Sequence, residues 1–304
     1  MQDMNFHNLL IHIYRATNKF KPLHKGLNST ATKLIVPALE RIYNFRTHHQ
    51  DPLWFRSALI LRYYEKESVQ IVKHMLKPGM ITLDVGAHVG YYSKLFSGLV
   101  GKQGKVVAFE PHPTTYQLLV KNIRALSNVI PLEVAVSDRS GRMPLYDFQV
   151  ETGSASLFDH EGRRTKAARE VIDGLAPRST VMSNHIYDVE ISTIDNCLQM
   201  LGITHIDFVK IDIEGAELLA LYGMEKTLQK SQKVAMLIEF APTHLLDFGF
   251  HWKEAIDALR KMGFLNLNAV TQHGLIEVNN LKFGRICEQL IQNYSQINLI
   301  CLKG

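Results

Sequence analysis

The stretch ITLDVGAHVGYYSKLF, residues 81–96, decides the fold of this 304-residue chain. It begins with apolar and β-branched residues, reaches Asp84 near the end of a candidate strand, passes Gly86 and Gly90, and continues as a helix-compatible segment. A strand, a glycine turn and a helix in this order form the start of a βαβ unit in a parallel sheet. In such sheets ligands bind beyond the carboxyl ends of the strands. We therefore predict that Asp84 and the glycine turn face a ligand crevice.

The rest of the chain continues this alternation. From residue 80 onward, short apolar runs are separated by segments of helical periodicity, which predicts an α/β domain with a doubly wound, seven-stranded, mostly parallel sheet. A strand-like piece at 142–148 is expected to form a small hairpin after the third strand. The predicted strands are 80–85, 104–110, 129–136, 205–212, 234–240, 263–270 and 295–302, and the predicted helices are 91–100, 113–126, 215–222 and 252–262.

Two regions lie outside this alternation. Residues 1–60 show helical spacing interrupted by a loop, and we expect a helical N-terminal extension ahead of a core domain at 61–304. Near this boundary a single helix is predicted over 57–76, ending at the KPG of 77–79. Residues 151–187 are polar and rich in turn residues, and we interpret them as an inserted lid or substrate element, with an ordinary surface loop as the alternative.

The composition is that of an ordinary globular protein, with 46% hydrophobic residues. Its three cysteines, Cys197, Cys287 and Cys301, contain no CxxC pair, so neither a disulfide framework nor a zinc site is predicted. No apolar run approaches the roughly 18 residues that a membrane span needs, and the N-terminus lacks the pattern of a signal peptide. We expect a cytoplasmic protein.

The formal net charge of +5 is concentrated at one end of the chain. Residues 1–50 hold seven Lys or Arg and two acids, whereas the remaining residues hold 27 of each sign. This basic arm suits a peripheral contact with anionic lipid or an acidic partner, and a solvated face is the alternative. Because aromatic residues are not interleaved with the basic ones densely enough, nucleic acid is not predicted as the leading partner.

The glycine turn and a second acid indicate the class of cofactor. Gly86 and Gly90 are spaced Gly-x-x-x-Gly and lack the Gly-x-Gly-x-x-Gly that cradles a pyrophosphate. The carboxylate of Asp84 would repel phosphates and attract a sulfonium or ammonium group. Glu110 ends the second predicted strand, where an acid commonly accepts hydrogen bonds from both ribose hydroxyls. S-adenosylmethionine fits this description, and a tight structural turn with a helix-capping acid is the alternative.

Five blocks of the sequence resemble the FkbM family of S-adenosylmethionine-dependent methyltransferases. In chain order they are DVGAHVGYYS, VVAFEPHP, LEVAVSDRSG, TID at 193–195 and IDFVKIDIEGAEL at 206–218. The resemblance covers roughly residues 61–304. It implies a seven-stranded sheet with a reversed last hairpin and, usually, O-methylation of hydroxyls on sugars, glycolipids or natural products.

The resemblance also implies a cofactor site. One departure concerns His88, because the family generally has Asn there; an imidazole still donates a hydrogen bond, so altered detail is expected rather than lost binding. Under this resemblance Asp84, Gly86 and Gly90 would line the methionine side of the cofactor. Glu110 would hold the ribose, and Ser137 or Asp138 would lie near the adenine. Ala87 and His88, within the same turn, are further candidate cofactor-binding residues.

A second group of acids gathers at strand ends. Asp212, Glu214 and Glu217 follow one predicted strand, and Glu239 ends the next. Charged side chains at buried strand tips are costly without partners, so their convergence indicates a ligand or mutual hydrogen bonds. We predict that Asp212, Glu214 or Glu239 acts as the base or orienting group for methyl transfer. Glu217 equally suits the first turn of a helix, where the macrodipole favours an acid.

Several alternatives stay open at this point. Lys210 is a candidate electrostatic partner of Asp212, and His244 is a further candidate base. The acids would also suit a divalent cation that lowers the pKa of the acceptor hydroxyl, although we favour a site without metal. Rival functions are a nicotinamide-dependent oxidoreductase and a catalytically silent module that binds a membrane or a partner. We expect a small-molecule or carbohydrate-like acceptor, and a homodimer as the default assembly.

Overall fold

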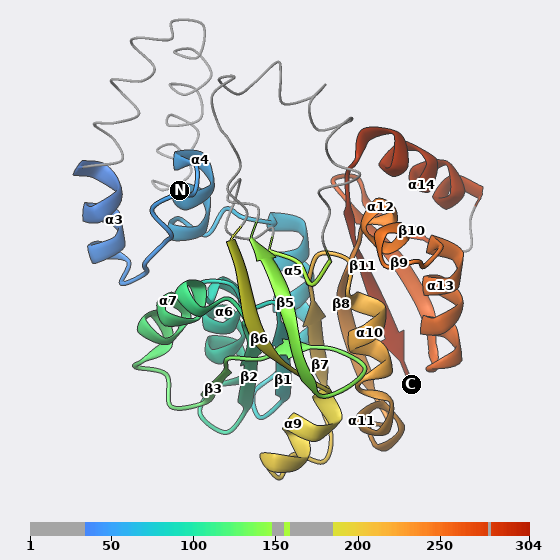
Figure 1. Ribbon diagram of the computed structural model, residues 1–304, viewed down its shortest axis with the longest axis horizontal. Helices are drawn as coiled ribbons and strands as arrows, with labels where there is room; N and C mark the ends of the chain where they lie inside the picture. Colours follow the sequence, from blue (N-terminus) through green and yellow to red (C-terminus); the bar gives the residue numbers. More distant parts are fainter. Residues whose placement is uncertain (1–33, 148–154, 159–184, 279–280) are drawn as a thin grey trace, which may run out of the picture.

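The computed structural model describes residues 34–147, 155–158, 185–278 and 281–304, and the structural statements below concern these residues (Figure 1). Its centre is an eight-stranded sheet in the order β10-β9-β11-β8-β7-β1-β2-β3. The strands are β1 (Ile81–Val85), β2 (Lys105–Phe109), β3 (Val129–Leu132), β7 (Phe208–Ile211), β8 (Val234–Phe240), β9 (Phe264–Thr271), β10 (Gly274–Glu277) and β11 (Ile297–Lys303).

Strand directions confirm the predicted fold class. β3, β2, β1, β7 and β8 run parallel, as expected for a doubly wound sheet. β11 lies between β8 and β9 and runs antiparallel to both, which is the reversed last hairpin. Because of this reversal, Ile297 at the start of β11 pairs with Phe240 at the carboxyl end of β8. The sequence does not predict β10, since this strand is four residues long and largely exposed.

A second sheet corrects two strand predictions. The segment predicted as one strand over 129–136 divides into β3 and β4 (Ala135–Val136), and β4 belongs to a three-stranded sheet of order β4-β6-β5. The strand-like piece at 142–148 is β5 (Gly141–Asp147), which pairs antiparallel with β6 (His185–Ser192) instead of forming a local hairpin. β6 escapes sequence-based prediction because its first four residues are polar or exposed.

Helices cover both faces of the main sheet (Figure 1). The strands supply alternate residues to the two layers, as the two-residue repeat of a strand requires. In β2, Val106 and Ala108 join the cluster of one helix layer, whereas Val107 and Phe109 join the other. The first layer contains α5 (Lys66–Met75), α6 (Tyr91–Val100) and α7 (Pro113–Ile123), and the second contains α9 (Ile194–Met200), α10 (Glu217–Tyr222), α11 (Glu225–Lys230), α12 (Pro242–Asp247), α13 (Trp252–Lys261) and α14 (Leu281–Asn293).

The helix predicted over 57–76 is wrong in one respect, because the structure forms two helices there. α4 (Leu53–Ile60) and α5 are separated by a turn in which Arg62 and Glu65 have φ values of 60° and 46°. The apolar periodicity of the sequence continues through this turn. Its Tyr64 still packs inward, with its ring edge-on to Phe55 and the two ring centroids 5.3 Å apart. Hydrophobic spacing alone therefore does not reveal the break.

The described part of the N-terminal arm contains α3 (Val36–Ile42) and α4 and packs against the core domain. Val36, Phe45 and Phe55 form one apolar cluster with Val89, which lies in the glycine turn after β1. Residues 1–33 of the predicted extension lie outside the described residues. So does the predicted insertion at 151–187, apart from residues 155–158 and the start of β6. Among the described helices, none has the length and apolarity to cross a membrane.

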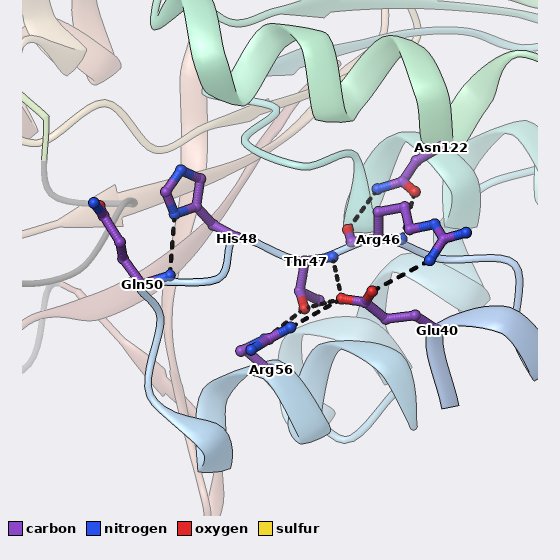
Figure 2. Close-up of polar contacts among 7 residues, drawn as sticks. All are labelled: Glu40, Arg46, Thr47, His48, Gln50, Arg56 and Asn122. Carbon is purple, nitrogen blue, oxygen red and sulfur yellow. Dashed lines mark hydrogen bonds and ion pairs between the residues drawn. The ribbon is translucent and has the colours of Figure 1, made fainter. Parts of the chain in front are cut away.

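A buried polar network stabilises this arm (Figure 2). Oε1 of Glu40 accepts hydrogen bonds from the backbone N–H of Thr47 at 2.9 Å, from its hydroxyl at 2.6 Å and from Nη2 of Arg56 at 3.2 Å. Nε of Arg56 also donates to the Thr47 hydroxyl at 2.8 Å. Each polar atom at the centre of the network therefore has a partner, as a buried charge requires.

Asn122 on α7 links the arm to the glycine turn (Figure 2). Its amide oxygen accepts from the backbone N–H of Arg46 at 2.6 Å, and its amide nitrogen donates to the Arg46 carbonyl at 2.8 Å. The same nitrogen donates to the carbonyl of Val89 at 2.7 Å. One side chain thus fixes the arm relative to the turn that follows β1.

Candidate active site

The glycine turn after β1 has a conformation that only glycine adopts easily. Gly86 and Gly90 have φ values of 82° and 88°. A Cβ on Gly86 would overlap the carbonyl oxygen of Asp212, and one on Gly90 would stand 2.8 Å from Leu119 Cδ1. The turn is held to β2 because the N–H groups of Gly86 and Ala87 donate to the Phe109 carbonyl at 3.1 and 2.8 Å. Both glycines are therefore required for a turn pressed between neighbouring segments.

Asp84 lies fully buried beneath this turn. Its Oδ2 accepts a hydrogen bond from the Ser93 hydroxyl at 2.6 Å, whereas Oδ1 has no hydrogen-bond partner in the part of the chain that the structure describes. Burial raises the pKa of Asp84, and the nearby Lys210 ammonium and the Ser93 hydroxyl oppose this increase. The environment favours a positive group near Asp84.

Glu110 follows β2 and is held by two backbone N–H groups. His88 donates to its Oε2 at 2.8 Å and His112 donates to its Oε1 at 2.9 Å. Burial raises the pKa of Glu110 to about 7, although the two N–H donors work against this rise. Each carboxylate oxygen keeps acceptor capacity beyond the bond it makes here.

His88 reaches this site through its backbone. Its φ is 50°, and its N–H is the donor to Glu110. The imidazole lies 6.0 Å from the ring of Phe55, so the side chain meets the N-terminal arm. Burial lowers the pKa of His88 to about 4, which keeps the ring neutral at neutral pH.

The predicted adenine contacts lie apart from the groove at the strand ends. Ser137 is buried, its N–H donates to the Ser192 carbonyl at 2.9 Å, and its hydroxyl donates to Asp138 Oδ1 at 3.1 Å. Neither Ser137 nor Asp138 lines the groove. The structure does bring Gly86, His88, Glu110, Asp212 and Glu214 together there, opposite an apolar wall formed by Val134, Leu145, Ala155, Leu157 and Ala216.

Asp212 lies next to the glycine turn, at the end of β7. Its N–H donates to the Val85 carbonyl at 3.0 Å, and its Oδ2 accepts from Nζ of Lys210 at 2.6 Å. Burial alone would lower the pKa of Lys210, but the carboxylates of Asp212, Glu65 and Asp84 outweigh burial and raise it. The ammonium therefore stays charged and orients the Asp212 carboxylate, as predicted from the sequence for Lys210.

Glu214 and Glu239 lie beside His244 at the ends of β7 and β8. Nδ1 of His244 is 3.3 Å from Oε2 of Glu214. Glu239 accepts a hydrogen bond at Oε1 from Nε2 of Gln296 at 2.6 Å. Burial raises the pKa of Glu239 well above its usual value, and the carboxylates of Asp212, Glu214 and Glu217 add to this effect.

One carboxylate oxygen of Glu217, Oε1, is occupied within its own loop, whereas Oε2 has no hydrogen-bond partner among the described residues. Glu217 begins α10, and its Oε1 accepts hydrogen bonds from the N–H groups of Ile213 and Gly215, both at 3.1 Å. Burial raises its pKa to about 7. The position at the start of a helix agrees with the macrodipole interpretation made from the sequence.

Comparison with known proteins decides the family. The model described as Methyltransferase FkbM domain matches residues 84–265, which is more than half of the chain. This chain belongs to the FkbM methyltransferase family. The resemblance seen in the sequence is thereby confirmed, and the family assignment gives no support to a nicotinamide-dependent oxidoreductase.

Among the curated FkbM-like relatives, the methyltransferase sdnD of Sordaria araneosa is 31% identical over 47% of this chain and 60% of its own length. The 2-O-methyltransferase NoeI of Sinorhizobium fredii is 29% identical, over 54% of this chain and 65% of its own. The hexuronic acid methyltransferase AglP of Haloferax volcanii is 26% identical over 54% and 58%. The chain thus spans 58–65% of the length of these relatives.

Solved structures share less with the FkbM chain. A SAM-dependent methyltransferase from Aquifex aeolicus is 14% identical with a TM-score of 0.41, covering 79% of this chain and 90% of that one. Fibrillarin from Aeropyrum pernix, solved with bound S-adenosyl-L-methionine, is 12% identical with a TM-score of 0.40, covering 79% and 75%.

Several residues of this FkbM site are not predictable from the sequence motifs. The apolar wall comes from β5, from residues 155–158 and from the residues that precede β4 and α10. Gln296 reaches Glu239 from a segment near the end of the chain. The sequence indicates His244 only as a further candidate base, yet the structure places it next to Glu214. These contacts depend on how strands distant in sequence meet at one edge, which no local motif encodes.

Proposed function

We propose that this chain is an S-adenosylmethionine-dependent methyltransferase that methylates a hydroxyl of a sugar, glycolipid or natural product. The observation that carries the proposal is the carboxylate of Glu110, held by two backbone N–H groups at the tip of β2 and lining the groove beside Gly86. An acid so placed after the second strand of a parallel sheet is suited to both ribose hydroxyls.

The other predicted cofactor residues would act around this anchor. Gly86 and Gly90 allow the backbone to approach the cofactor, and Ala87 and His88 complete the turn between them. The buried carboxylate of Asp84 and the partly exposed carboxylate of Asp212 favour a sulfonium over a phosphate. The apolar wall of Leu145, Ala155 and Leu157 is suited to the adenine ring, while an adenine contact for Ser137 or Asp138 stays a prediction.

Methyl transfer would proceed as an in-line displacement. The acceptor oxygen attacks the methyl carbon, the carbon–sulfur bond breaks, the sulfonium becomes a neutral thioether, and the hydroxyl proton passes to a base. Alignment of the reactants supplies on the order of 7–11 kcal/mol in favourable cases, and a base contributes about 10²–10⁴-fold. Positioning therefore dominates, and a weak base is sufficient.

Asp212 is the preferred base or orienting group. It lies against the glycine turn, and Lys210 fixes its carboxylate. Glu239 is less suited to accept a proton because its raised pKa favours the protonated form, in which it would orient a hydroxyl. Glu214 remains a second candidate base through its contact with His244.

A carbohydrate-like acceptor is supported by two lines of argument. Several carboxylates at one groove can accept hydrogen bonds from several hydroxyls. Two similar proteins carry the names 2-O-methyltransferase and hexuronic acid methyltransferase. A cytoplasmic location, a homodimer, the absence of nucleic-acid partners and a peripheral contact through the basic arm stay predictions.

Calorimetric titration tests the cofactor assignment. S-adenosylhomocysteine should bind the wild type, and Glu110→Ala should weaken binding at least about tenfold, because a hydrogen bond to a charged group contributes about 1.5–3 kcal/mol. Glu133→Ala, which removes an exposed acid just after β3, serves as the control and should leave binding unchanged. Equal affinity in Glu110→Ala, or tight binding of NAD in place of S-adenosylhomocysteine, would refute the assignment. Labelled S-adenosylmethionine with candidate glycan acceptors then identifies the product.

A further inference from the structure

Three side chains at the carboxyl ends of β7 and β8 converge from separate segments. Glu214 belongs to the loop after β7, Glu239 to the end of β8, and His244 to α12. Each offers one ligand atom, and these atoms all lie within 4.8 Å of one another. Two carboxylates and an imidazole at this separation are close enough to share one bound ion.

Glu239 gives independent evidence for a missing partner. Its side chain is buried, with 7% exposure, and only Oε1 is satisfied, by the amide of Gln296 at 2.6 Å. Within the described ranges of the chain, Oε2 has no hydrogen-bond partner. Burying a carboxylate oxygen without a partner is unfavourable, and the neighbouring acids Asp212 and Glu214 add repulsion.

The loop that carries Glu214 is held in a rarely adopted conformation. Glu214 has a φ of 56°, a left-handed backbone conformation that a residue with a side chain rarely adopts unless the surroundings enforce it. The surroundings do so here. A Cβ on the following Gly215 would stand 2.9 Å from the His244 carbonyl and from the Phe248 ring, and the Ser156 hydroxyl donates to the Glu214 carbonyl at 3.1 Å. Glu214 and His244 are thereby fixed against each other before any ligand arrives.

The ammonium group of Lys210, on β7, forms its ion pair with Asp212. Nζ of Lys210 is 2.6 Å from Asp212 Oδ2 and lies 4.9 Å from the centre of the Tyr92 ring. It therefore pairs with Asp212 and not with Oε2 of Glu239, which has no hydrogen-bond partner among the described residues. Asp212 in turn is not one of the three clustered ligands.

We propose that Glu214, Glu239 and His244 bind a divalent metal ion at this edge of the groove. Carboxylate oxygens suit Mg²⁺ and Mn²⁺ and an imidazole suits the later transition metals, so Mn²⁺ is the ion that the mixed set accepts most readily. Three protein ligands leave coordination positions for acceptor oxygens. The ion would bind the acceptor hydroxyl and lower its pKa, a role that rests on the proposed function, whereas binding of the ion does not.

The site is tested by titrating the full-length protein with Mn²⁺ and following the electron paramagnetic resonance signal of the free ion. The wild type should remove one equivalent of Mn²⁺ from solution in a saturable manner. Glu239→Gln and His244→Ala should each weaken binding at least about tenfold, the lower end of the loss seen when a group that only orients a metal ligand is removed. Asp188→Asn, which alters an exposed carboxylate paired with Arg142, is the matched control and should bind as the wild type does.

Binding of S-adenosylhomocysteine is measured by calorimetry on the same samples. Retained affinity shows that each variant is folded, and His244 is the safer position because its side chain is 15% exposed. The proposal is overturned if the wild type takes up no Mn²⁺, or if both ligand variants bind it as tightly as the control. Loss of cofactor binding in every sample, with Mn²⁺ binding intact, would instead count against the methyltransferase function alone.

Discussion

Glu40 in the N-terminal network and Glu239 at the end of β8 are equally buried, at 7% exposure, and their surroundings are opposite. Glu40 accepts hydrogen bonds from Thr47 and Arg56 (Figure 2), and although burial raises its pKa, these donors outweigh burial and lower it. Among the residues that the structure describes, Glu239 has one hydrogen-bond partner, the amide of Gln296, and burial together with three nearby carboxylates raises its pKa. A fully satisfied buried acid serves the fold, whereas one left short of partners is available to a ligand.

The largest expected effect concerns the methyl-transfer activity of the candidate active site, the region that contains Glu239. Asp212→Asn keeps an oxygen that accepts from Lys210 but removes the basic carboxylate, so turnover should fall by about 10²–10⁴-fold. The measurement is single-turnover methyl transfer from labelled S-adenosylmethionine. The control is Asp257→Asn, an exposed acid on α13. Full activity of Asp212→Asn would move the search for the base to Glu214, Glu239 and His244.

The second effect concerns the stability that the buried network around Glu40 gives to the N-terminal arm. Arg56→Ala removes the guanidinium that faces Glu40 at 3.2 Å and leaves a buried carboxylate with less compensation. The free energy of unfolding should fall by about 3–5 kcal/mol, as is usual when one member of a buried ion pair is removed. Urea denaturation measures the change. Arg142→Ala, which breaks an exposed ion pair, should cost no more than about 1 kcal/mol, and an equal loss in both variants would contradict the contrast.

The smallest effect is a pH dependence of opposite sign at the two acids. The raised pKa of Glu239 means that its contribution to stability is present below the unfolded pKa of about 4.5 and is lost as the pH rises through the folded pKa. Glu239→Gln, studied with a chelator present, should therefore gain stability relative to the wild type as the pH rises. The lowered pKa of Glu40 reverses the sign, so the loss in Glu40→Gln should be greatest at neutral pH and shrink as the pH falls through the folded pKa. Denaturant midpoints between about pH 2 and pH 8 measure both, because the folded pKa of Glu40 lies below 4.5, and parallel pH profiles would refute the distinction.

The sequence predicts well which acids lie at the carboxyl ends of the parallel strands, because the rule that these ends meet at one edge of a sheet is general. Four acids lie near or just after the ends of strands with strong apolar periodicity, so their position at one edge of the sheet follows from the topology. They are Asp84, Glu110, Asp212 and Glu239. Gly86 is predictable for a similar reason, since its φ of 82° is required by the turn itself.

The remaining parts depend on contacts between distant segments. Pairing of β5 with β6 crosses a gap of 37 residues between Asp147 and His185, and the polar start of β6 hides it from periodicity. The proximity of His244 to Glu214 depends on packing between Gly215 and α12. Ser137 belongs to a sequence motif, but its hydroxyl donates a hydrogen bond to Asp138, and the motif does not reveal this contact.

The antiparallel course of β11 has a practical consequence for how this protein can be divided. The family match ends at residue 265, yet the reversal of the last strand returns Gln296 to the carboxyl tip of β8, where it is the one hydrogen-bond donor to Glu239 in the described chain. A fragment trimmed to the region of sequence similarity would keep every motif residue and still lose that donor. Gene fusions or truncations should therefore retain the C-terminal strand, since this edge of the candidate site is completed by residues that no motif includes.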